Sequence, residues 1–157
     1  MIDPRRAAID RPEHHQAIAL LYRHFNEAWN RHDAESMARL FDDEAELISR
    51  DGRSAQGAAA ILALLQLTFR DDATTTYVAA VTRMRKISFH VGVLHGCMSA
   101  IRPGETEIDP ERAMLQTLVT SSETGEWQIA SFQSTPVQLL ERPDLLEALR
   151  GELRRGS

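Results

Sequence analysis

The stretch AWNRHDAESMARLFDDEAELISRDGRSAQG, residues 28–57, has the pattern of the end of one helix, a second short helix, a strand and a turn. Residues 30–33 interrupt the apolar stripe of the first helix. Asp33 is suited to cap a second helix over 34–41, because its carboxylate can accept backbone N–H groups. Residues 45–49 then have the composition of a short strand, followed by a turn. The stretch therefore predicts a change from helical to extended chain near residue 45.

Helical periodicity continues on both sides of this stretch. Upstream, residues 12–30 place apolar side chains at steps of three and four, which predicts an amphipathic helix. Downstream, the almost wholly apolar run after Gly57 predicts a buried helix, and residues 144–154 predict a last helix with a leucine stripe. Residues 1–11 are polar and are expected to form a flexible arm, so that 12–157 make up a single domain.

The second half of the chain has the character of a β-sheet. Four segments are rich in Val, Thr, Ile and aromatic residues and are separated by breaks that include a short hairpin signal. They cover residues 74–88, 89–101, 112–122 and 126–135. Long strands in series with tight turns indicate an antiparallel meander. Helices gathered before such a sheet define the α+β fold class.

The composition is that of one globular domain. The chain has 157 residues, of which 43% are hydrophobic and 26% charged. The net charge of -5 disfavours a nucleic-acid partner, because a negative surface repels phosphate. No apolar run approaches the roughly 18 residues of a membrane span, so no membrane partner is expected. Cys97 is the single cysteine, which, without a signal-peptide pattern at the N-terminus, favours the reducing cytoplasm.

Several short motifs carry a resemblance to a known family. Residues 28–57 contain Trp-x-x-His-Asp, Leu-Phe-x-x-Asp/Glu-Ala and Asp-Gly-x-x-x-x-Gly, and GEWQIASFQSTPV (125–137) contains Trp-x-Ile. In these motifs the chain resembles SnoaL-like proteins of the nuclear transport factor 2-like superfamily, nearest to the SgcJ/EcaC type, which includes accessory proteins of enediyne antibiotic biosynthesis. The resemblance implies a cone-shaped, curved antiparallel sheet wrapped by N-terminal helices, with a C-terminal helix, a small-molecule pocket and a homodimer formed through the sheet.

The carboxylates that relatives are expected to use as bases are absent from the corresponding positions. In steroid isomerases the aspartate lies just after the first strand, which falls near Ser49 here. In polyketide cyclases it lies near the end of the last strand, where this chain has Gln133-Ser134. The SgcJ/EcaC type often has histidine in place of Gln133. No His-Glu-x-x-His or Cys-x-x-Cys spacing occurs, so neither a metal nor another cofactor is expected.

His95 is the preferred catalytic candidate. It alternates along its strand with Phe89, Val91, Val93 and Cys97, a more apolar set than the neighbours of His90. Only one of these two faces can point into the pocket at a given place, because side chains alternate along a strand. A histidine in the core or at an interface is the alternative for His95.

Five further residues are candidates for contact with a ligand. Trp29, Phe41 and Trp127 would wall the pocket, although Trp29 and Phe41 also fit an ordinary core. Period two places Trp127 and Gln133 on one face of the last strand. Gln116 and Gln133 would each donate to a ligand carbonyl or pair with the protein itself, since a buried glutamine needs partners.

Two classes of function fit these observations. One is an enzyme-like protein of polyketide or enediyne-type biosynthesis, which binds a hydrophobic intermediate and assists its cyclisation, hydration or isomerisation. The other is a non-catalytic protein, which sequesters such a molecule or, as a structural homodimer, docks onto a partner enzyme. The absent carboxylates favour the second.

Overall fold

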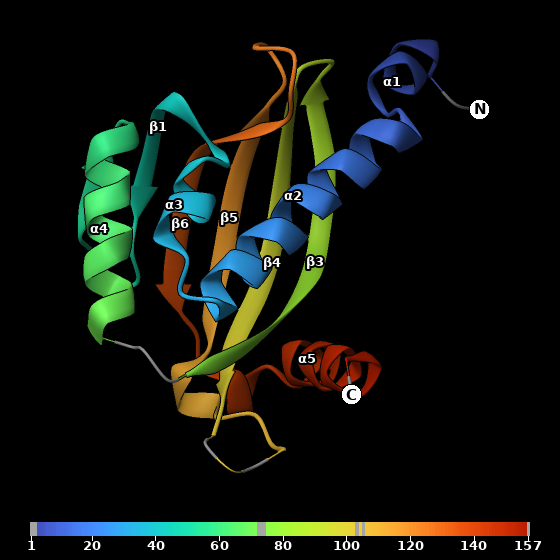
Figure 1. Ribbon diagram of the computed structural model, residues 1–157. Coiled ribbons are helices and arrows are strands. Elements are labelled where there is room, and N and C mark those ends of the chain that lie inside the picture. Colours follow the sequence, from blue (N-terminus) through green and yellow to red (C-terminus); the bar gives the residue numbers. More distant parts are fainter. Residues whose placement is uncertain (1–2, 72–74, 103, 105, 157) are drawn as a thin grey trace.

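A computed structural model describes residues 3–71, 75–102, 104 and 106–156. Its helices pack against a curved sheet (Figure 1). The helices are α1 (Pro4–Ile9), α2 (Pro12–Asn30), α3 (Ala34–Ala38), α4 (Ala58–Asp71) and α5 (Pro143–Arg155), with the single turns η1 (Pro110–Arg112) and η2 (Leu139–Glu141). The strands are β1 (Phe41–Ile48), β2 (Ser54–Gln56), β3 (Thr76–Ser88), β4 (Val91–Ile101), β5 (Met114–Ser121) and β6 (Gln128–Pro136).

The sheet has the strand order β2-β1-β6-β5-β4-β3. Strands β3 to β6 form the expected antiparallel meander, whereas β1 runs parallel to β6. A parallel pair needs a long connection, and here about half of the chain, residues 49–127, separates the two strands. The α+β class is therefore confirmed, with a mixed rather than purely antiparallel sheet.

The two faces of the sheet carry separate apolar clusters. Helix α2 crosses the concave face diagonally (Figure 1), and its Phe25 packs with Leu94 and Phe132 in the main core. Helix α5 covers part of the convex face, where Leu149 belongs to a second cluster with Cys97. Side chains alternate between the two faces along a strand, so neighbouring residues of one strand belong to different clusters.

The structure differs from two of the expected element boundaries in the first part of the chain. Residues 4–9, expected within a flexible arm, form α1, and Asp3 caps it by accepting from the backbone N–H of Arg5 at 2.9 Å. Phe41, expected at the end of the second helix, begins β1 instead. The backbone N–H of Ile129 donates to the carbonyl of Leu40 at 2.8 Å, so pairing with β6 overrides the local helical pattern.

The turn between α2 and α3 explains the Trp-x-x-His-Asp motif. His32 has a φ of 56°, and its N–H donates to Trp29 O at 2.9 Å while the N–H of Asp33 donates to Ala28 O at 3.0 Å. This pair of bonds is a Schellman motif, which ends α2. Asp33 then caps α3, as expected, by accepting from the N–H of Ser36 at 3.0 Å.

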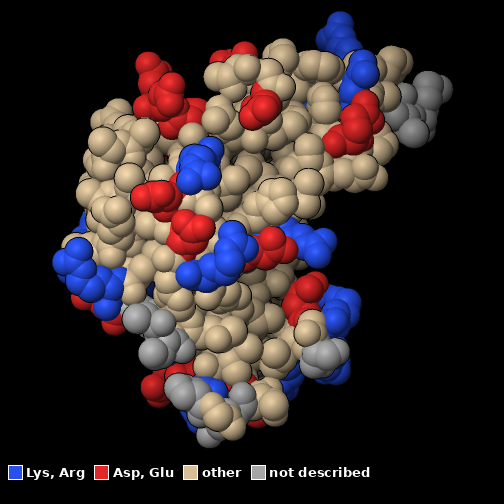
Figure 2. All heavy atoms as spheres, viewed as in Figure 1, with Lys and Arg blue, Asp and Glu red and all other residues tan. Residues whose placement is uncertain are grey.

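The surface carries charges of both signs. On the face seen in Figure 2, acidic and basic side chains are interspersed over the helices. Within the part of the chain that the structure describes, no helix has both the length and the apolar character required to cross a membrane.

Candidate functional site

A cavity of about 320 Å³ lies inside the cone, between α4, the end of α2 and the concave face of the sheet. Its apolar wall consists of Trp29, Leu47, Leu65, Met114 and Phe132. Its polar side chains are those of Ser49, Arg50, Asp51, Arg53, Thr68, Asp71, Tyr77, Arg112 and Ser134. A concave site with an apolar wall and polar groups that can orient a ligand is the usual form of a small-molecule site.

Trp29 is held in the wall by its neighbours. Its ring lies 5.8 Å from the rings of both Phe69 and Tyr77, measured between centroids, and both contacts are edge-on. The adjacent Asn30 pins this end of α2 to β3. Its amide donates to Tyr77 O at 2.9 Å and accepts from Tyr77 N–H at 2.8 Å. The side chain therefore makes the two backbone hydrogen bonds that a neighbouring strand would make. The sequence expectation that Trp29 walls the pocket agrees with this position.

Arg112 and Tyr77 lie together in the lining of the cavity. Arg112 is the last residue of the η1 turn, which Asp109 caps by accepting from Glu111 N–H at 3.1 Å. The Arg112 guanidinium donates to the Tyr77 hydroxyl at 3.0 Å and to Thr75 Oγ1 at 3.2 Å. These contacts hold the guanidinium against the Tyr77 hydroxyl in the lining of the cavity.

The position expected for an isomerase base does line the cavity, but it holds Ser49. The Ser49 hydroxyl donates to Asp51, which also accepts from Arg53 N–H at 3.2 Å and pairs with Arg53 Nε at 3.1 Å. The bond from Ser49 is the main cause that lowers the pKa of Asp51. Asp51 is therefore a weaker base than an ordinary aspartate.

Ser134 places a buried hydroxyl in the lining of the cavity. It is only 5% exposed, and its Oγ lies 3.5 Å from the sulfur of Met114, a weak acceptor. A ligand carbonyl would accept a stronger hydrogen bond from this hydroxyl than the thioether does. Sequence reasoning named the Gln133-Ser134 position and then favoured Gln133, so it missed the residue that faces the cavity.

The face of Gln133 was predicted incorrectly because β6 contains a bulge. Thr120 pairs with Ile129, but the next residue of β5, Val119, pairs with Ser131, which leaves Ala130 without an opposite residue. One extra residue reverses the alternation of side chains beyond it. Ile129 therefore faces the core, whereas Gln133 is exposed on the convex face.

His95 also faces away from the cavity. Gly92, Leu94 and Gly96 face α2, so the alternation places His95 with Cys97 on the convex side, opposite to the expected orientation. There its Nδ1 lies 3.2 Å from Thr117 Oγ1, in a groove that includes Gln133. The structure thus brings the two candidates together, but outside the cone.

The remaining candidates do not line the cavity. Gln116 is buried on the concave side and pairs with the protein, since its Oε1 accepts from the Tyr22 hydroxyl at 2.7 Å. Phe41 packs in the core against Phe25 and Phe132. Trp127 lies at the other end of the sheet, 5.3 Å from the ring of His14. Among the residues that the structure describes, no group of three or more metal-ligating side chains occurs.

The architecture identifies the class of protein and then the family. A curved sheet closed by helices over an internal cavity is a nuclear transport factor 2-like fold, also called cystatin-like. The SnoaL-like domain model matches residues 22–117, and the chain belongs to this family. No curated protein matches the chain.

Solved structures show the same fold. A domain of unknown function with a cystatin-like fold from Nostoc punctiforme PCC 73102 is 27% identical, covers 88% of this chain and 86% of its own, and has a TM-score of 0.76. A ketosteroid isomerase-like protein from Erwinia carotovora atroseptica SCRI1043 is 16% identical, with coverage of 81% and 98% and a TM-score of 0.67. An NTF-2 like protein of unknown function from Shewanella oneidensis MR-1 is 19% identical, with coverage of 77% and 98% and a TM-score of 0.63.

Proposed function

We propose that this protein binds a small, largely apolar molecule with a carbonyl group in the internal cavity. The observation that carries the proposal is the chamber itself, with Trp29, Leu65 and Phe132 on one side and the buried Ser134 hydroxyl within it. An apolar molecule gains about 25 cal/mol for each Å² of apolar surface that leaves water. The carbonyl group would be oriented by the Ser134 hydroxyl, whose acceptor is now a sulfur atom.

We further propose that the molecule is an intermediate of polyketide or enediyne-type biosynthesis and is bound in the cytoplasm. The support for this finer statement is the resemblance of residues 28–57 and 125–137 to SgcJ/EcaC-type proteins, and the lone Cys97. Polyketide intermediates carry ketone groups, and a ketone suits an apolar chamber with a hydroxyl donor.

Binding without chemistry is the form of the proposal that the geometry favours. Proton abstraction beside a carbonyl needs a base whose pKa is raised toward neutrality. Asp51 has a lowered pKa because Ser49 and Arg53 stabilise its charge, and His95 lies on the other face of the sheet. Cyclisation, hydration or isomerisation is the second candidate. The candidate base for such a reaction is Asp51, which lines the cavity two residues after Ser49.

The test uses naphthalene and 1-acetonaphthone, which differ by one acetyl group. We expect both to bind, with the ketone roughly 2- to 10-fold tighter, the equivalent of about 0.5–1.5 kcal/mol for one neutral hydrogen bond. Ser134→Ala should remove this preference and leave the affinity for naphthalene unchanged. Gln133→Ala, on the adjacent outward position, is the matched control and should keep the preference.

Calorimetry gives the affinities, and amide chemical shifts locate the probe. Shifts at Leu65 and Phe132 are expected on binding. Absence of binding by both probes, or shifts confined to the convex groove around His95, would overturn the assignment of the cavity. For the catalytic candidate, turnover of a ketone intermediate that falls about 10²–10⁴-fold in Asp51→Asn would replace binding with catalysis.

A further inference from the structure

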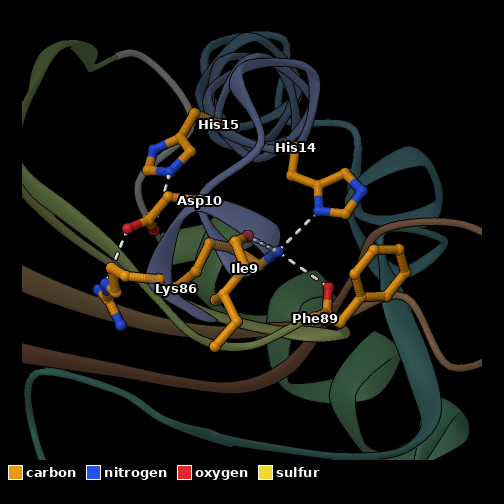
Figure 3. A network of polar contacts seen from close by, with 7 residues as sticks. Ile9, Asp10, His14, His15, Lys86 and Phe89 are labelled. Carbon is orange, nitrogen blue, oxygen red and sulfur yellow. Dashed lines mark hydrogen bonds and ion pairs between the residues drawn. The ribbon is translucent and has the colours of Figure 1, made fainter. Parts of the chain in front are cut away.

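Lys86, the only lysine of the chain, is fully buried at the end of the concave face where α1 and α2 meet. Its ammonium group donates to three acceptors, shown in Figure 3. They are the carbonyl of Ile9 at the end of α1 at 3.1 Å, the carbonyl of Phe89 at 2.9 Å, and Nδ1 of His14 at 2.7 Å. A lysine is rarely buried unless its donors are all paired, as they are here.

Aromatic rings complete the surroundings of the ammonium group. Nζ lies 5.0 Å from the centre of the Trp127 ring and 5.7 Å from that of Phe89. His14 contacts the same two rings edge-on, at 5.3 Å and 5.0 Å between centroids. Cation–π attraction favours the charged form of Lys86, whereas removal from water lowers its pKa. The cluster joins α1, α2, the β3–β4 turn and the chain before β6.

The contact between His14 and Lys86 defines the protonation state of the histidine. An ammonium group has three donors and no acceptor, so Nδ1 of His14 must carry a lone pair toward it. His14 is then neutral, with its proton on Nε2. A second proton would lie on Nδ1, where it would break the 2.7 Å hydrogen bond and place two positive groups in contact.

We propose that His14 and Lys86 form a pH-sensitive latch, which holds α1 on the end of the sheet and releases it when His14 takes up a proton. Release is expected to unfold α1 as well as detach it. The helix has only six residues, and a helix of this length is unstable without tertiary contacts.

Other charged groups face the latch. Asp10 pairs with Arg6 at 2.7 Å and with His15 at 3.5 Å. Arg11 lies over Phe89 at 5.3 Å and pairs loosely with Glu13 at 3.8 Å. Around His14, Glu13 favours the charged imidazole, whereas Lys86, Arg11 and His90 oppose it.

The balance of these effects sets the direction of the pH dependence. Loss of water around His14 is the largest effect and the charge of Lys86 the second, and together they lower the pKa of His14 from its ordinary value of about 6.5. His14 binds the proton more tightly once α1 is released than while α1 is docked, so the latch is complete above about pH 6.5 and weakens as the pH falls. Because one proton is taken up, the fraction of molecules with α1 released rises by up to about tenfold for each unit that the pH falls. This rise ends when the pH reaches the pKa of His14 in the docked state.

Hydrogen exchange of the intact protein measures the open fraction. The amides of Ala7 and Asp10 donate within α1 at 3.0 Å and 2.8 Å, and their protection, corrected for the intrinsic rate at each pH, should fall between pH 7.5 and 5. His14→Asn keeps an acceptor near the position of Nδ1 but does not titrate, so its protection should stay constant. His15→Asn, the neighbouring histidine, should still lose protection. Equal pH dependence in wild type and His14→Asn would overturn the proposal.

Two further measurements do not depend on these variants. Nitrogen NMR of the His14 ring should show a proton on Nε2 at pH 7.5, and a proton on Nδ1 would contradict the latch. His14→Arg places a permanent positive charge beside Lys86, so an amine reagent at pH 8 should modify Lys86 at least tenfold faster than in wild type. Peptide mapping separates this product from that of the N-terminal amine, and equal slow labelling of both proteins would overturn the proposal.

Discussion

At the scale of single residues, Gly96 has no room for a side chain because the Tyr22 ring lies against it. A Cβ atom at this position would overlap the Tyr22 ring, whose Cε2 would lie 2.9 Å away, and Tyr22 cannot move without losing its 2.7 Å hydrogen bond to Gln116. We expect Gly96→Ala to lower the free energy of unfolding by about 1–3 kcal/mol, measured by urea denaturation. Gly151→Ala, in α5 with its closest neighbour at 3.6 Å, should instead raise it by up to about 1 kcal/mol.

Cys97 is a second residue whose behaviour follows from burial. The side chain is 0% exposed, and burial raises the pKa of its thiol to about 11. The thiolate is the reactive form, so we expect a thiol reagent to modify folded protein at pH 7.4 far more slowly than protein in urea. Rapid modification of protein with an unchanged circular dichroism spectrum would contradict this prediction and identify Cys97 as a reactive thiol.

At the scale of elements, α5 is the cover of the convex cluster. Leu149 is 0% exposed and belongs to the same cluster as Cys97. Leu149→Ala should lower the free energy of unfolding by about 2–5 kcal/mol, because the cavity left behind fills only in part. It should also speed modification of Cys97. Leu140→Ala is the control, since Leu140 is 75% exposed and its loss should change stability by no more than about 0.5 kcal/mol.

At the scale of the whole molecule, the uncovered part of the convex face is where we expect a second copy. Arg83, His95, Thr117 and Gln133 pair in one row across four strands, with the partly buried Val119 beside them. We predict a homodimer at micromolar concentration by light scattering, and a monomer for Val119→Asp. Leu67→Asp, on the exposed side of α4, should remain dimeric. A monomeric mass for the wild type would refute the prediction.

The sequence by itself determined the elements whose signals are local. Asp33 caps α3, the apolar steps of α2 face the core, and the meander follows the predicted segments, because these features depend on residues within a few positions of one another. Trp29 was likewise placed in the cavity wall. The family motifs then led to the SnoaL-like fold, which the family match confirms.

Only the tertiary structure decided which face each strand presents and what the ends of the chain contact. The bulge at Ala130 turns Gln133 outward and Ser134 inward, the pairing of Phe41 with Ile129 converts a helix end into a strand, and Lys86 meets His14 across 72 positions. Each of these depends on partners remote in sequence. A single unpaired residue moves every later side chain of the strand to the opposite face of the sheet. The residues around it do not indicate where the partner strand leaves that residue unpaired.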